Sequence, residues 1–550
     1  LVTPGMPAFT IVATDAMRVR AWVDEAALGR LAVGQPVRLV FRSEGDRSFA
    51  GVVERIGREV DRQTHELLAD VDGTSEAAGP DYCDAGVLRV LRRRSLAALR
   101  AEVEPVTPTD LARFLPAWQG IGSTARGSDG VLRAVEQLSG VVLPASALET
   151  LVLPSRVLDY SPALLDGLTA TGEVLWQGHG ALPGDDGWVS LHVADLAAVT
   201  LARPDAEGLT PAHEAVLHAL GAGGAYFFRT LADVVQTPEG PVEDTRLAEL
   251  LWELLWAGYL TNDTLAPLRA QLSGGRTAHR SRPAGPRRSR YAARAGGLGA
   301  GLPGRGAGRA ALPARATPPT VGGRWSLLPA AEPDATLTAY GRAEVLLDRY
   351  GVLTRGAVAA EDVPGGFAGV YRVLAAAEDA GRVRRGYFVE GLGAAQFGST
   401  GAIDRLRATA RPPAEPTRAA TLHSLVLPAC DPANPYGAAL AWPARPTLDA
   451  EGGRGHLPAR KAGALVALVD GDLVLYVERG GRSLLTWSED PQLLQPAADA
   501  LALAVREGAL GRITVERTDG ERVLGSDHPL AQALARAGFH ATPKGLRLRR

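Results

Sequence analysis

Residues 367–388, FAGVYRVLAAAEDAGRVRRGYF, join a helix-like segment to a strand-like segment through one glycine. Phe367, Val370 and Leu374 recur at the spacing that lines one face of a helix. Gly381 can then adopt the left-handed conformation that commonly ends a helix, and the chain beyond it can turn back as a strand. The stretch predicts the last helix and the wing of a winged-helix module.

The order of helix, glycine and extended run occurs four times, which indicates a repeated module. The four copies lie at residues 164–176, 247–260, 367–388 and 534–546. A winged-helix module has further helices before this last one, and two of the copies have candidates for them. In one, Thr210 followed by Pro211 suits the start of a helix, and in the other Thr354 can cap one. We therefore expect two complete winged-helix modules and two partial ones.

The charge of the chain is nearly balanced, with 59 basic against 61 acidic residues and a formal net charge of -2. Any affinity for nucleic acid must therefore come from local patches. One such patch is the segment 273–322, which is rich in Arg, Gly and Pro and lies in a stretch between Asp263 and Glu332 that holds no carboxylate. This composition cannot bury a core, so it predicts a cationic linker that could follow a nucleic-acid backbone.

Cysteine content and hydrophobicity indicate where the chain resides. Only Cys83 and Cys430 are present, too far apart in sequence for a disulfide framework or a cysteine-based zinc site, which favours a reducing compartment. No stretch approaches the roughly 18 consecutive apolar residues of a membrane helix. We expect a cytoplasmic chain with no membrane contact for residues 84–550. Because the sequence starts at Leu1 without a charged leader, we also expect a truncated start.

Several motifs of enzymes and metal proteins are absent from the sequence. The phosphate-binding loop of an ATPase needs GxxxxGK[ST], whereas Lys461 is followed by AGAL and Lys544 by GLRL. HExxH, CxxC and GxSxG do not occur either. We expect no ATP hydrolysis, no metal and no cofactor in this chain.

Four further segments carry a family resemblance. They are GVLRVLRRRSLAALRAEVEPV at 86–106, FLPAWQGI at 114–121, DPANPYGAALAWP at 431–443 and TPKGLRLR at 542–549. Together with the repeated modules between them, they resemble the C-terminal region of the bacterial large helicase-related (Lhr) proteins.

This resemblance implies a set of properties that composition does not show. Lhr proteins are ATP-dependent translocases on single-stranded DNA that are linked to repair. Their C-terminal region carries tandem winged helices and is similar to AlkZ-type DNA glycosylases, and activity on uracil-containing DNA is ascribed to some members. The resemblance assigns ATP and Mg to a motor whose motifs this chain lacks, names DNA as the partner, and makes a homo-oligomer plausible.

A second resemblance concerns the N-terminal residues. Residues 18–41, RVRAWVDEAALGRLAVGQPVRLVF, resemble the β-barrel of HlyD-type periplasmic adaptors of efflux pumps. The membrane anchor, lipoyl-like domain and helical hairpin of that family are absent. We therefore expect a chimeric chain, with a fragment of an efflux membrane-fusion adaptor as an alternative.

The expected architecture is α+β and multidomain. It consists of an adaptor-like β-barrel at 1–72, a helical plus winged-helix-like module at 84–205, winged helices at 206–272 and 323–398, the linker at 273–322, and a C-terminal mixed α/β domain resembling AlkZ-type glycosylases at 399–550.

Candidate catalytic residues follow from the glycosylase resemblance. AlkZ-type enzymes use a Q-x-Q or Q-x-D pair, which points to Gln396, although Gly398 leaves the second polar group missing. Asp470 and Asp472 are further candidates for a base-excision site. An aspartate that only forms a turn is the alternative for both.

Candidate DNA contacts are arginines and one aromatic residue. Arginines suit phosphates, and an aromatic ring can stack on a base. The residues are Arg92, Arg93, Arg94, Arg372, Arg382, Arg384, Arg385 and Trp325. The leading hypothesis is a DNA-binding accessory region of an ATP-dependent Lhr-type repair helicase, and the alternative is a DNA glycosylase acting on damaged or uracil-containing DNA.

Overall fold

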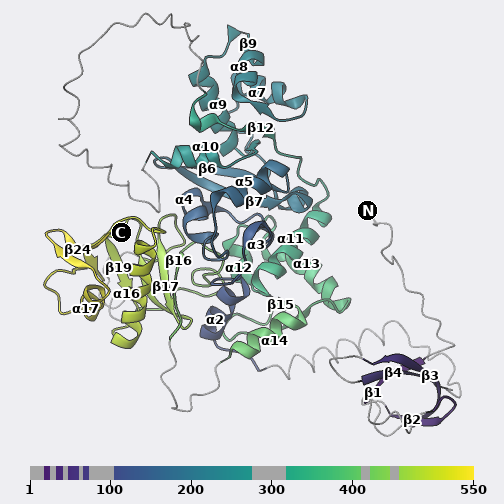
Figure 1. Ribbon diagram of the computed structural model, residues 1–550. Coiled ribbons are helices and arrows are strands. Elements are labelled where there is room, and N and C mark those ends of the chain that lie inside the picture. The colour runs from purple at the N-terminus through teal and green to yellow at the C-terminus, as the bar shows by residue number, and fades with distance from the viewer. Residues whose placement is uncertain are drawn as a thin grey trace, which may run out of the picture. The chain divides into compact units, whose positions relative to one another are not determined.

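The computed structural model of the chain divides into two compact units, residues 1–97 and 98–550 (Figure 1). The structure describes residues 18–24, 32–40, 48–60, 66–73, 104–238, 240–274, 317–410, 422–445 and 457–549. The predicted arginine cluster of Arg92, Arg93 and Arg94 lies outside these residues. Within them, no helix is both long and apolar enough to cross a membrane.

The described part of the first unit is an antiparallel sheet of four strands. The strands are β1 (Arg18–Asp24), β2 (Pro36–Val40), β3 (Ser48–Val60) and β4 (Glu66–Gly73). Their order is β1-β4-β3-β2, so β1 and β2 form the two edges. The strand-rich prediction is confirmed, but no closed barrel is seen, because no pairing joins β1 to β2 in the described residues. The adaptor resemblance stays a prediction.

The second unit begins with α2 (Pro108–Trp118), which Thr107 caps, and continues into a first winged-helix module. Its elements are α3 (Gly127–Leu138), β5 (Leu143–Pro144), α4 (Ala145–Ala147), the π-helix η3 (Leu148–Val152), α5 (Pro162–Thr171), β6 (Val174–Leu182) and β7 (Asp186–Val193). The sheet order β5-β7-β6 places the last strand between the other two. The short helices η4 (Ala194–Leu196) and α6 (Ala197–Thr200) follow.

A second module of the same topology follows. Its elements are α7 (Pro211–Gly221), β8 (Tyr226–Phe227), α8 (Phe228–Val234), β9 (Gln236–Thr237), β10 (Gly240–Pro241), α9 (Asp244–Trp256), β11 (Leu260–Asn262), α10 (Ala266–Leu272), η5 (Pro319–Val321) and β12 (Arg324–Leu327). Thr210 caps α7 and Pro211 opens it, as predicted. The sheet order is β11-β12-β8, again with the last strand in the middle.

This topology corrects the position of the arginine-rich segment. β12 pairs with β11 of the second module, Asn262 opposite Trp325, and with β8. Both ends of the segment 273–322 therefore return to one sheet. Residues 275–316 therefore stand between described elements of one module, whereas the sequence prediction placed the segment 273–322 between two modules. The long-range pairing of β12 decides this, and no local sequence signal reports it.

A third module contains the stretch that opened the sequence analysis. Its elements are α11 (Ala335–Tyr350), β13 (Val352–Leu353), α12 (Arg355–Ala360), α13 (Gly366–Asp379), β14 (Arg384–Gly386), β15 (Gln396–Gly398) and the added helix α14 (Thr400–Thr409). Thr354 caps α12, as predicted. The sheet order β13-β15-β14 repeats the winged-helix topology.

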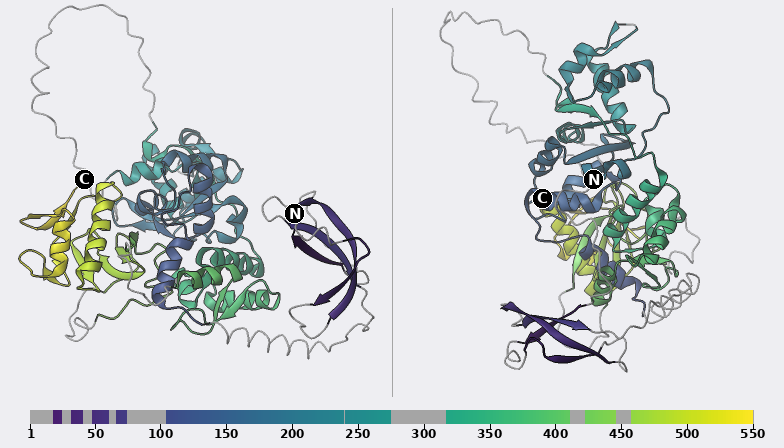
Figure 2. Two further views of the ribbon diagram at one scale, coloured as in Figure 1. Left: turned by 60° about the horizontal axis from the view of Figure 1, so that its bottom comes forward. Right: turned by 90° about the vertical axis from the view of Figure 1, so that its right-hand side faces the viewer.

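The C-terminal part is mixed α/β, as expected. Six strands form one sheet in the order β16 (Ser424–Pro428), β17 (Leu465–Val469), β18 (Asp472–Val477), β19 (Ser483–Thr486), β21 (Arg517–Thr518) and β22 (Glu521–Arg522). α16 (Pro491–Arg506) packs against β16, β17 and β18 (Figure 2). α17 (Pro529–Arg536) adjoins a smaller sheet in the order β20 (Ile513–Val515), β24 (Gly545–Leu548) and β23 (His540–Thr542).

Glycines end the last helix of each repeated segment, as the sequence predicts. Gly172, Gly258, Gly381 and Gly538 have φ values of 80°, 83°, 75° and 98°. After α13, the Gly381 N–H donates to the Glu378 carbonyl and the Arg382 N–H donates to the Ala377 carbonyl, both at 2.9 Å. This pair of bonds satisfies carbonyls at the end of the helix and turns the chain toward β14.

The modules of the second unit share hydrophobic cores. One core joins the first two modules around Trp176 and Trp325. Another joins the third module to α2 and to the sheet that contains Tyr476. These cores fix the first module against the second and the third against the C-terminal part, and α11 of the third module packs against α3 and α6 of the first.

Candidate nucleic-acid interface

The wing of the third module has the inward and outward pattern that the sequence predicts. Val383 and Phe388 are buried, with 7% and 3% of their surface exposed. Arg384 alternates with Val383 along the chain and is exposed. The apolar side chains therefore hold the wing to its core and leave the charged ones to face outward.

The arginines of this wing and of α13 serve two different roles. Arg385 lies against the buried Glu378, with its Nε 3.3 Å from a carboxylate oxygen, and donates to the Tyr371 hydroxyl. Arg385 therefore supports the fold. Arg372, Arg382 and Arg384 are exposed and have no carboxylate partner among the described residues. These three present positive charge to solvent.

Arg382 is oriented by an aromatic side chain of α11. Its Nη1 donates to the Tyr340 hydroxyl at 2.8 Å, and its guanidinium lies 5.8 Å from the centre of the Tyr340 ring. The tyrosine holds the arginine at the edge of α13 without neutralising its charge. A phosphate can therefore still approach it.

Gln396 braces the wing from the inside. Its side chain is fully buried, and its amide oxygen accepts from the N–H groups of Phe388 and Val389 at 3.0 and 2.9 Å. The amide nitrogen donates to the carbonyls of Val389 and Gly393, both at 2.8 Å. Every hydrogen-bonding position of the amide is occupied, so the geometry gives the predicted catalytic role no support.

Asp470 and Asp472 belong to the turn between β17 and β18. Asp470 has a φ of 51°, and its carbonyl accepts from Arg113 Nε at 2.7 Å. Asp472 accepts from the Thr109 hydroxyl at 3.0 Å. The pair thus docks α2 onto the C-terminal sheet, which matches the turn-forming alternative. The structure places Gln396 in the wing of another module, where its side chain bonds only to groups of that wing among the described residues.

The stacking role predicted for Trp325 was wrong. The side chain has no exposed surface, and its Nε1 donates to the Val321 carbonyl at 3.2 Å. Its ring packs edge-on against Trp252, with centres 6.0 Å apart. A base could reach it only if the core of the second module opened.

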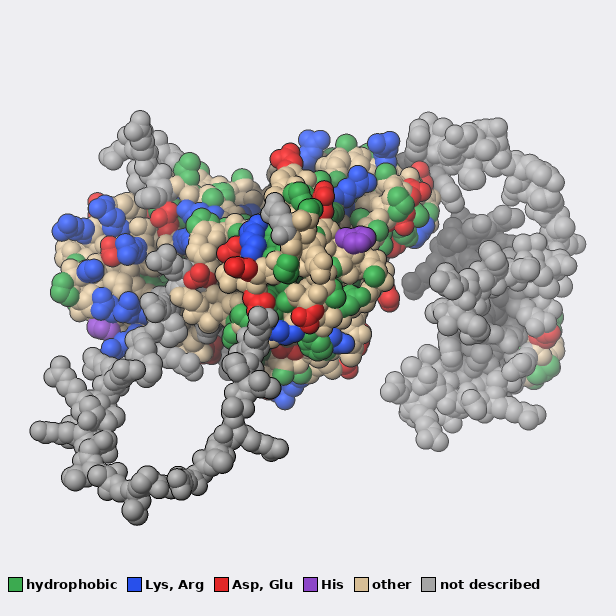
Figure 3. Space-filling view, turned by 90° about the horizontal axis from the view of Figure 1, so that it is seen from above, with side chains coloured by type: hydrophobic (Ala, Val, Ile, Leu, Met, Phe, Trp, Pro, Cys, Tyr) green, Lys and Arg blue, Asp and Glu red, His purple; other side chains and the backbone are tan. Residues whose placement is uncertain are grey.

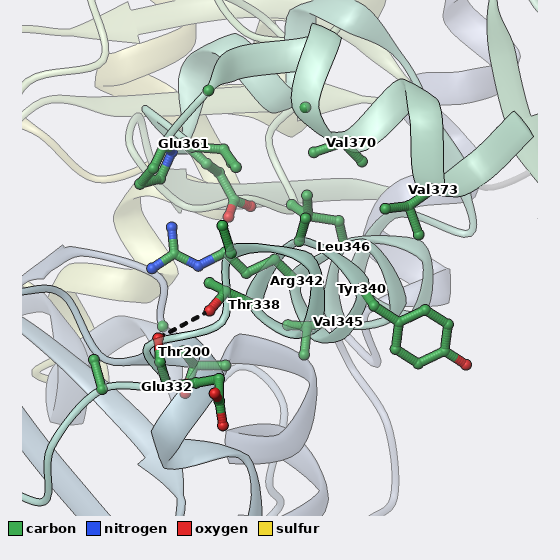
Figure 4. A pocket seen from close by; sticks show the side chains of 18 of the residues that line it. Thr200, Glu332, Thr338, Tyr340, Arg342, Val345, Leu346, Glu361, Val370 and Val373 are labelled. Atoms are coloured by element: carbon green, nitrogen blue, oxygen red, sulfur yellow. Dashed lines mark hydrogen bonds between the residues drawn. The ribbon is translucent and has the colours of Figure 1, made fainter. Parts of the chain in front are cut away.

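A groove lies between the first and third modules, and the sequence analysis missed it. Its volume is about 1190 Å³, and it is bordered by α11, α13 and residues 198–203. Figure 4 shows Thr338, Tyr340 and Arg342 of α11 near Val370 and Val373 of α13. Arg203, Arg342, Arg372 and Arg382 line it, and none has a carboxylate partner among the described residues. Glu332, Glu361 and Asp362 are its acidic members.

Arg342 joins the two modules through backbone carbonyls. Its Nε donates to the Val199 carbonyl at 2.9 Å, and its Nη2 donates to the Leu201 carbonyl at 3.4 Å. Burial and the nearby Arg203 lower the pKa of Arg342. The groove therefore holds a half-buried positive charge that this part of the chain does not neutralise.

A chain of hydrogen bonds between polar side chains reaches the groove at both ends. Ser190 Oγ lies 2.6 Å from Nε2 of His179 and 2.6 Å from Nε2 of His192. His192 Nδ1 lies 2.9 Å from Thr200 Oγ1, which donates to the Leu196 carbonyl at 2.9 Å. His179 and Thr200 line the groove, whereas Ser190 and His192 are buried.

The Leu196 carbonyl fixes the direction of every bond in this chain. Thr200 gives its only proton to that carbonyl, so His192 Nδ1 must donate to Thr200. The neutral His192 ring then accepts from Ser190 through Nε2, and Ser190 accepts from His179 Nε2. His179 Nδ1 is left as a lone-pair acceptor.

Both histidines are neutral at physiological pH. Burial lowers the pKa of His179 to about 4. Burial, followed by His179, Arg349 and Arg342, lowers the pKa of His192 to about 3. The groove therefore combines arginine charges with a neutral hydrogen-bond acceptor.

Away from the groove, the first module contacts the C-terminal part through a buried ion pair. Nη1 and Nη2 of Arg156 donate to Asp431, at 3.0 and 2.7 Å, and Nη2 also donates to Gln119 Oε1 at 2.9 Å. Arg156 and Asp431 are 2% and 0% exposed. The face shown in Figure 3 carries both acidic and basic side chains.

The modules define a winged-helix protein, and comparison with known proteins gives its family. Residues 106–194 and 332–418 match winged-helix domains of the large helicase-related protein. The chain is 51% identical over 488 residues to the Lhr helicase/probable uracil glycosylase of Mycolicibacterium smegmatis. It is 39% identical over 485 residues to the Lhr helicase/uracil glycosylase of Escherichia coli.

The chain belongs to the large helicase-related family. The alignments cover 86% and 84% of this chain and 30% of each relative. The matched part is the C-terminal part of those proteins. The family resemblance drawn from the sequence is therefore confirmed.

Proposed function

We propose that this chain binds DNA as the accessory region of an Lhr-type repair helicase, with α13 and its wing as the main contact. The carrying observation is that Arg372, Arg382 and Arg384 project from this helix and wing without carboxylate partners among the described residues. A winged helix commonly lays its last helix along DNA, and arginines at its edge suit phosphates. ATP- and Mg-dependent movement would belong to the rest of such a helicase, and self-association stays a prediction.

The arginine-rich segment within the second module supports the same proposal. Residues 275–316 contain ten arginines and no carboxylate. The described residues on either side of it belong to one winged-helix module, in the position where a wing approaches DNA. This segment would add phosphate contacts that carry no sequence preference.

Salt-dependent binding tests this proposal. The chain should bind duplex DNA at low salt, and the triple variant Arg372→Ala/Arg382→Ala/Arg384→Ala should bind more weakly. Each lost phosphate contact lowers the slope of log affinity against log salt by about 0.9 on duplex DNA, so the slope should fall by about 2 to 3. Fluorescence anisotropy at several salt concentrations measures it.

The control for this test is Arg246→Ala, because Arg246 lies on α9 and pairs with Glu253 at 2.8 Å. It removes a charge that is already compensated, so the slope should stay the same. No binding by the wild type at low salt, or an unchanged slope in the triple variant, would refute the proposal.

A second candidate is removal of uracil from DNA. The observation in its favour is that both curated relatives carry uracil glycosylase in their names. Incubation with uracil-containing single strands should then leave alkali-labile sites without ATP. Intact substrate at an excess of the chain would exclude the activity, and unchanged activity of Gln396→Ala would separate it from the predicted residue.

A further inference from the structure

We propose that the groove between α11, α13 and residues 198–203 holds the base of an unpaired nucleotide, with His179 Nδ1 as the hydrogen-bond acceptor for that base. The inference rests on the proposed DNA binding and adds a place where a base leaves the strand. It uses residues of the first and third modules together.

The hydrogen-bond chain determines what His179 can bind. Its Nε2 proton is committed to Ser190, and the chain through His192 and Thr200 ends on the Leu196 carbonyl. His179 Nδ1 can therefore only accept, and its partner must offer an N–H or O–H group. Ring N–H and exocyclic amino groups of an unpaired base are such donors, whereas a phosphate oxygen is not.

The arginines around the groove suit the phosphates on either side of that base. Arg203, Arg372 and Arg382 are exposed, and Arg382 stands at the end of α13 beside Tyr340. Arg342 lies deeper and keeps its charge against backbone carbonyls. A strand that crosses from the third module to the first would thus meet positive charge at the rim and a neutral acceptor beyond it.

The shape and lining of the groove are compatible with a flat ring. Val345 and Leu346 of α11 and Val370 and Val373 of α13 supply apolar surface (Figure 4). Its volume of about 1190 Å³ exceeds the few hundred Å³ of a small ligand site. A base with its sugar fits, and the faces of the ring would rest on apolar side chains.

The test compares two single-stranded probes of equal length and charge. One is an oligothymidylate, whose N3–H can donate to His179, and the other carries N3-methylthymine throughout, which has no such donor. The wild type should bind the first about three- to tenfold more tightly, since one hydrogen bond distinguishes them. His179→Phe, which lacks the acceptor, should bind both probes equally.

A blocking variant tests the groove without touching the hydrogen-bond chain. Gly369 lies on α13 in the wall of the groove, and a Cβ placed there would come no nearer than 3.7 Å to another atom. Gly369→Leu should therefore fold and lose the preference for oligothymidylate. The matched control Gly401→Leu lies on α14, where a Cβ meets nothing within 4 Å, and should keep that preference.

The outcomes separate this inference from the proposed function. Equal binding of the two probes by the wild type, or a preference that survives Gly369→Leu, would overturn the base site while DNA binding stands. Binding of neither probe at low salt would instead contradict the proposed function. Circular dichroism of each variant shows whether it has folded.

Discussion

The first winged-helix module meets two other parts of the chain, and the two contacts are built in opposite ways. Its contact with the C-terminal part is closed to solvent and contains the buried ion pair of Arg156 and Asp431. Its contact with the third module leaves an open groove, where Arg203, Arg342, Arg372 and Arg382 have no carboxylate partners among the described residues and only Arg349 pairs with one, Glu361. The same residue type therefore serves cohesion in one place and is available to a ligand in the other.

The difference shows that the number of arginines says little about nucleic-acid binding in this chain. The Lys and Arg residues are nearly equal in number to the Asp and Glu residues. Several arginines form ion pairs with carboxylates of this chain. Arg269 contacts Glu149 and Asp166, each at 2.7 Å, and Arg349 contacts Glu361. Only the three-dimensional pairing identifies the arginines that remain available for phosphate.

The largest expected effect is the loss of stability when the buried ion pair between the first module and the C-terminal part is broken. Asp431→Ala should lower the free energy of unfolding by about 3–5 kcal/mol, because it leaves the buried Arg156 charge without its partner. It also removes an acceptor for the Ala433 N–H at 2.8 Å. Urea titration followed by tryptophan fluorescence measures the change.

The comparison for that variant is an exposed ion pair. Arg246 on α9 pairs with Glu253 at the surface, so Arg246→Ala should change stability by at most about 1 kcal/mol. If Asp431→Ala were equally mild, the contact between the first module and the C-terminal part would not depend on the buried pair.

The next effect concerns pH and the histidines of the open contact. An unfolded histidine has a pKa of about 6.5, whereas burial holds the pKa of His179 at about 4 and that of His192 at about 3. Between these values the unfolded chain binds more protons than the folded one. Stability should therefore be complete above about pH 6.5 and fall below it, by up to about 1.4 kcal/mol per pH unit for each histidine.

Denaturant titrations at several pH values between neutrality and pH 4.5 check this expectation. His192→Gln should flatten the dependence, whereas His540→Gln should not, since His540 is exposed on β23. A wild-type stability that does not change across this range would mean that the folded chain accommodates charged rings at His179 and His192.

The sequence predicts those parts of the structure that local chemistry determines. Gly381 ends α13, and Thr354 caps α12, because helix ends need a left-handed residue or a side-chain acceptor at defined positions. Val383 and Phe388 stand on either side of β14 and are buried, as apolar residues of a wing that packs on its core. The winged-helix modules follow from these signals in their proper order.

The sequence does not predict what depends on pairing between distant segments. Trp325 looked like a boundary aromatic, but β12 brings it back to β11 and β8 across the arginine-rich segment. Gln396 looked like half of a catalytic pair, but backbone groups of its own wing use its whole amide. The sequence around Trp325 does not report the pairing of β12, and the sequence around Gln396 does not report that the nearby wing turns its backbone groups toward the amide.

The histidine chain lies between these two cases. Ser190 and His192 are two residues apart on β7, so a strand prediction places them on one face. His179 joins them only through the pairing of β6 with β7, whose register shifts between Gly178 and Ala181. The sequence shows polar residues at 179, 190 and 192 in a predicted hairpin. It does not show the register of β6 against β7, which brings His179 to Ser190.

The smallest expected effect on stability belongs to Arg342 and sharpens the comparison most. Arg342→Met should change the free energy of unfolding by about 1 kcal/mol or less, because the loss of two bonds to carbonyls is offset by removing a half-buried charge beside Arg203. The same variant should bind single-stranded DNA with a salt slope lower by about 0.7. Urea titration and anisotropy at several salt concentrations measure the two quantities on one preparation.

Replacing an arginine of the open contact should thus weaken DNA binding and leave stability unchanged, the reverse of the result expected for Asp431→Ala. A loss of stability above about 3 kcal/mol would instead make Arg342 a cohesive residue like Arg156, and the contrast between the two contacts would fail.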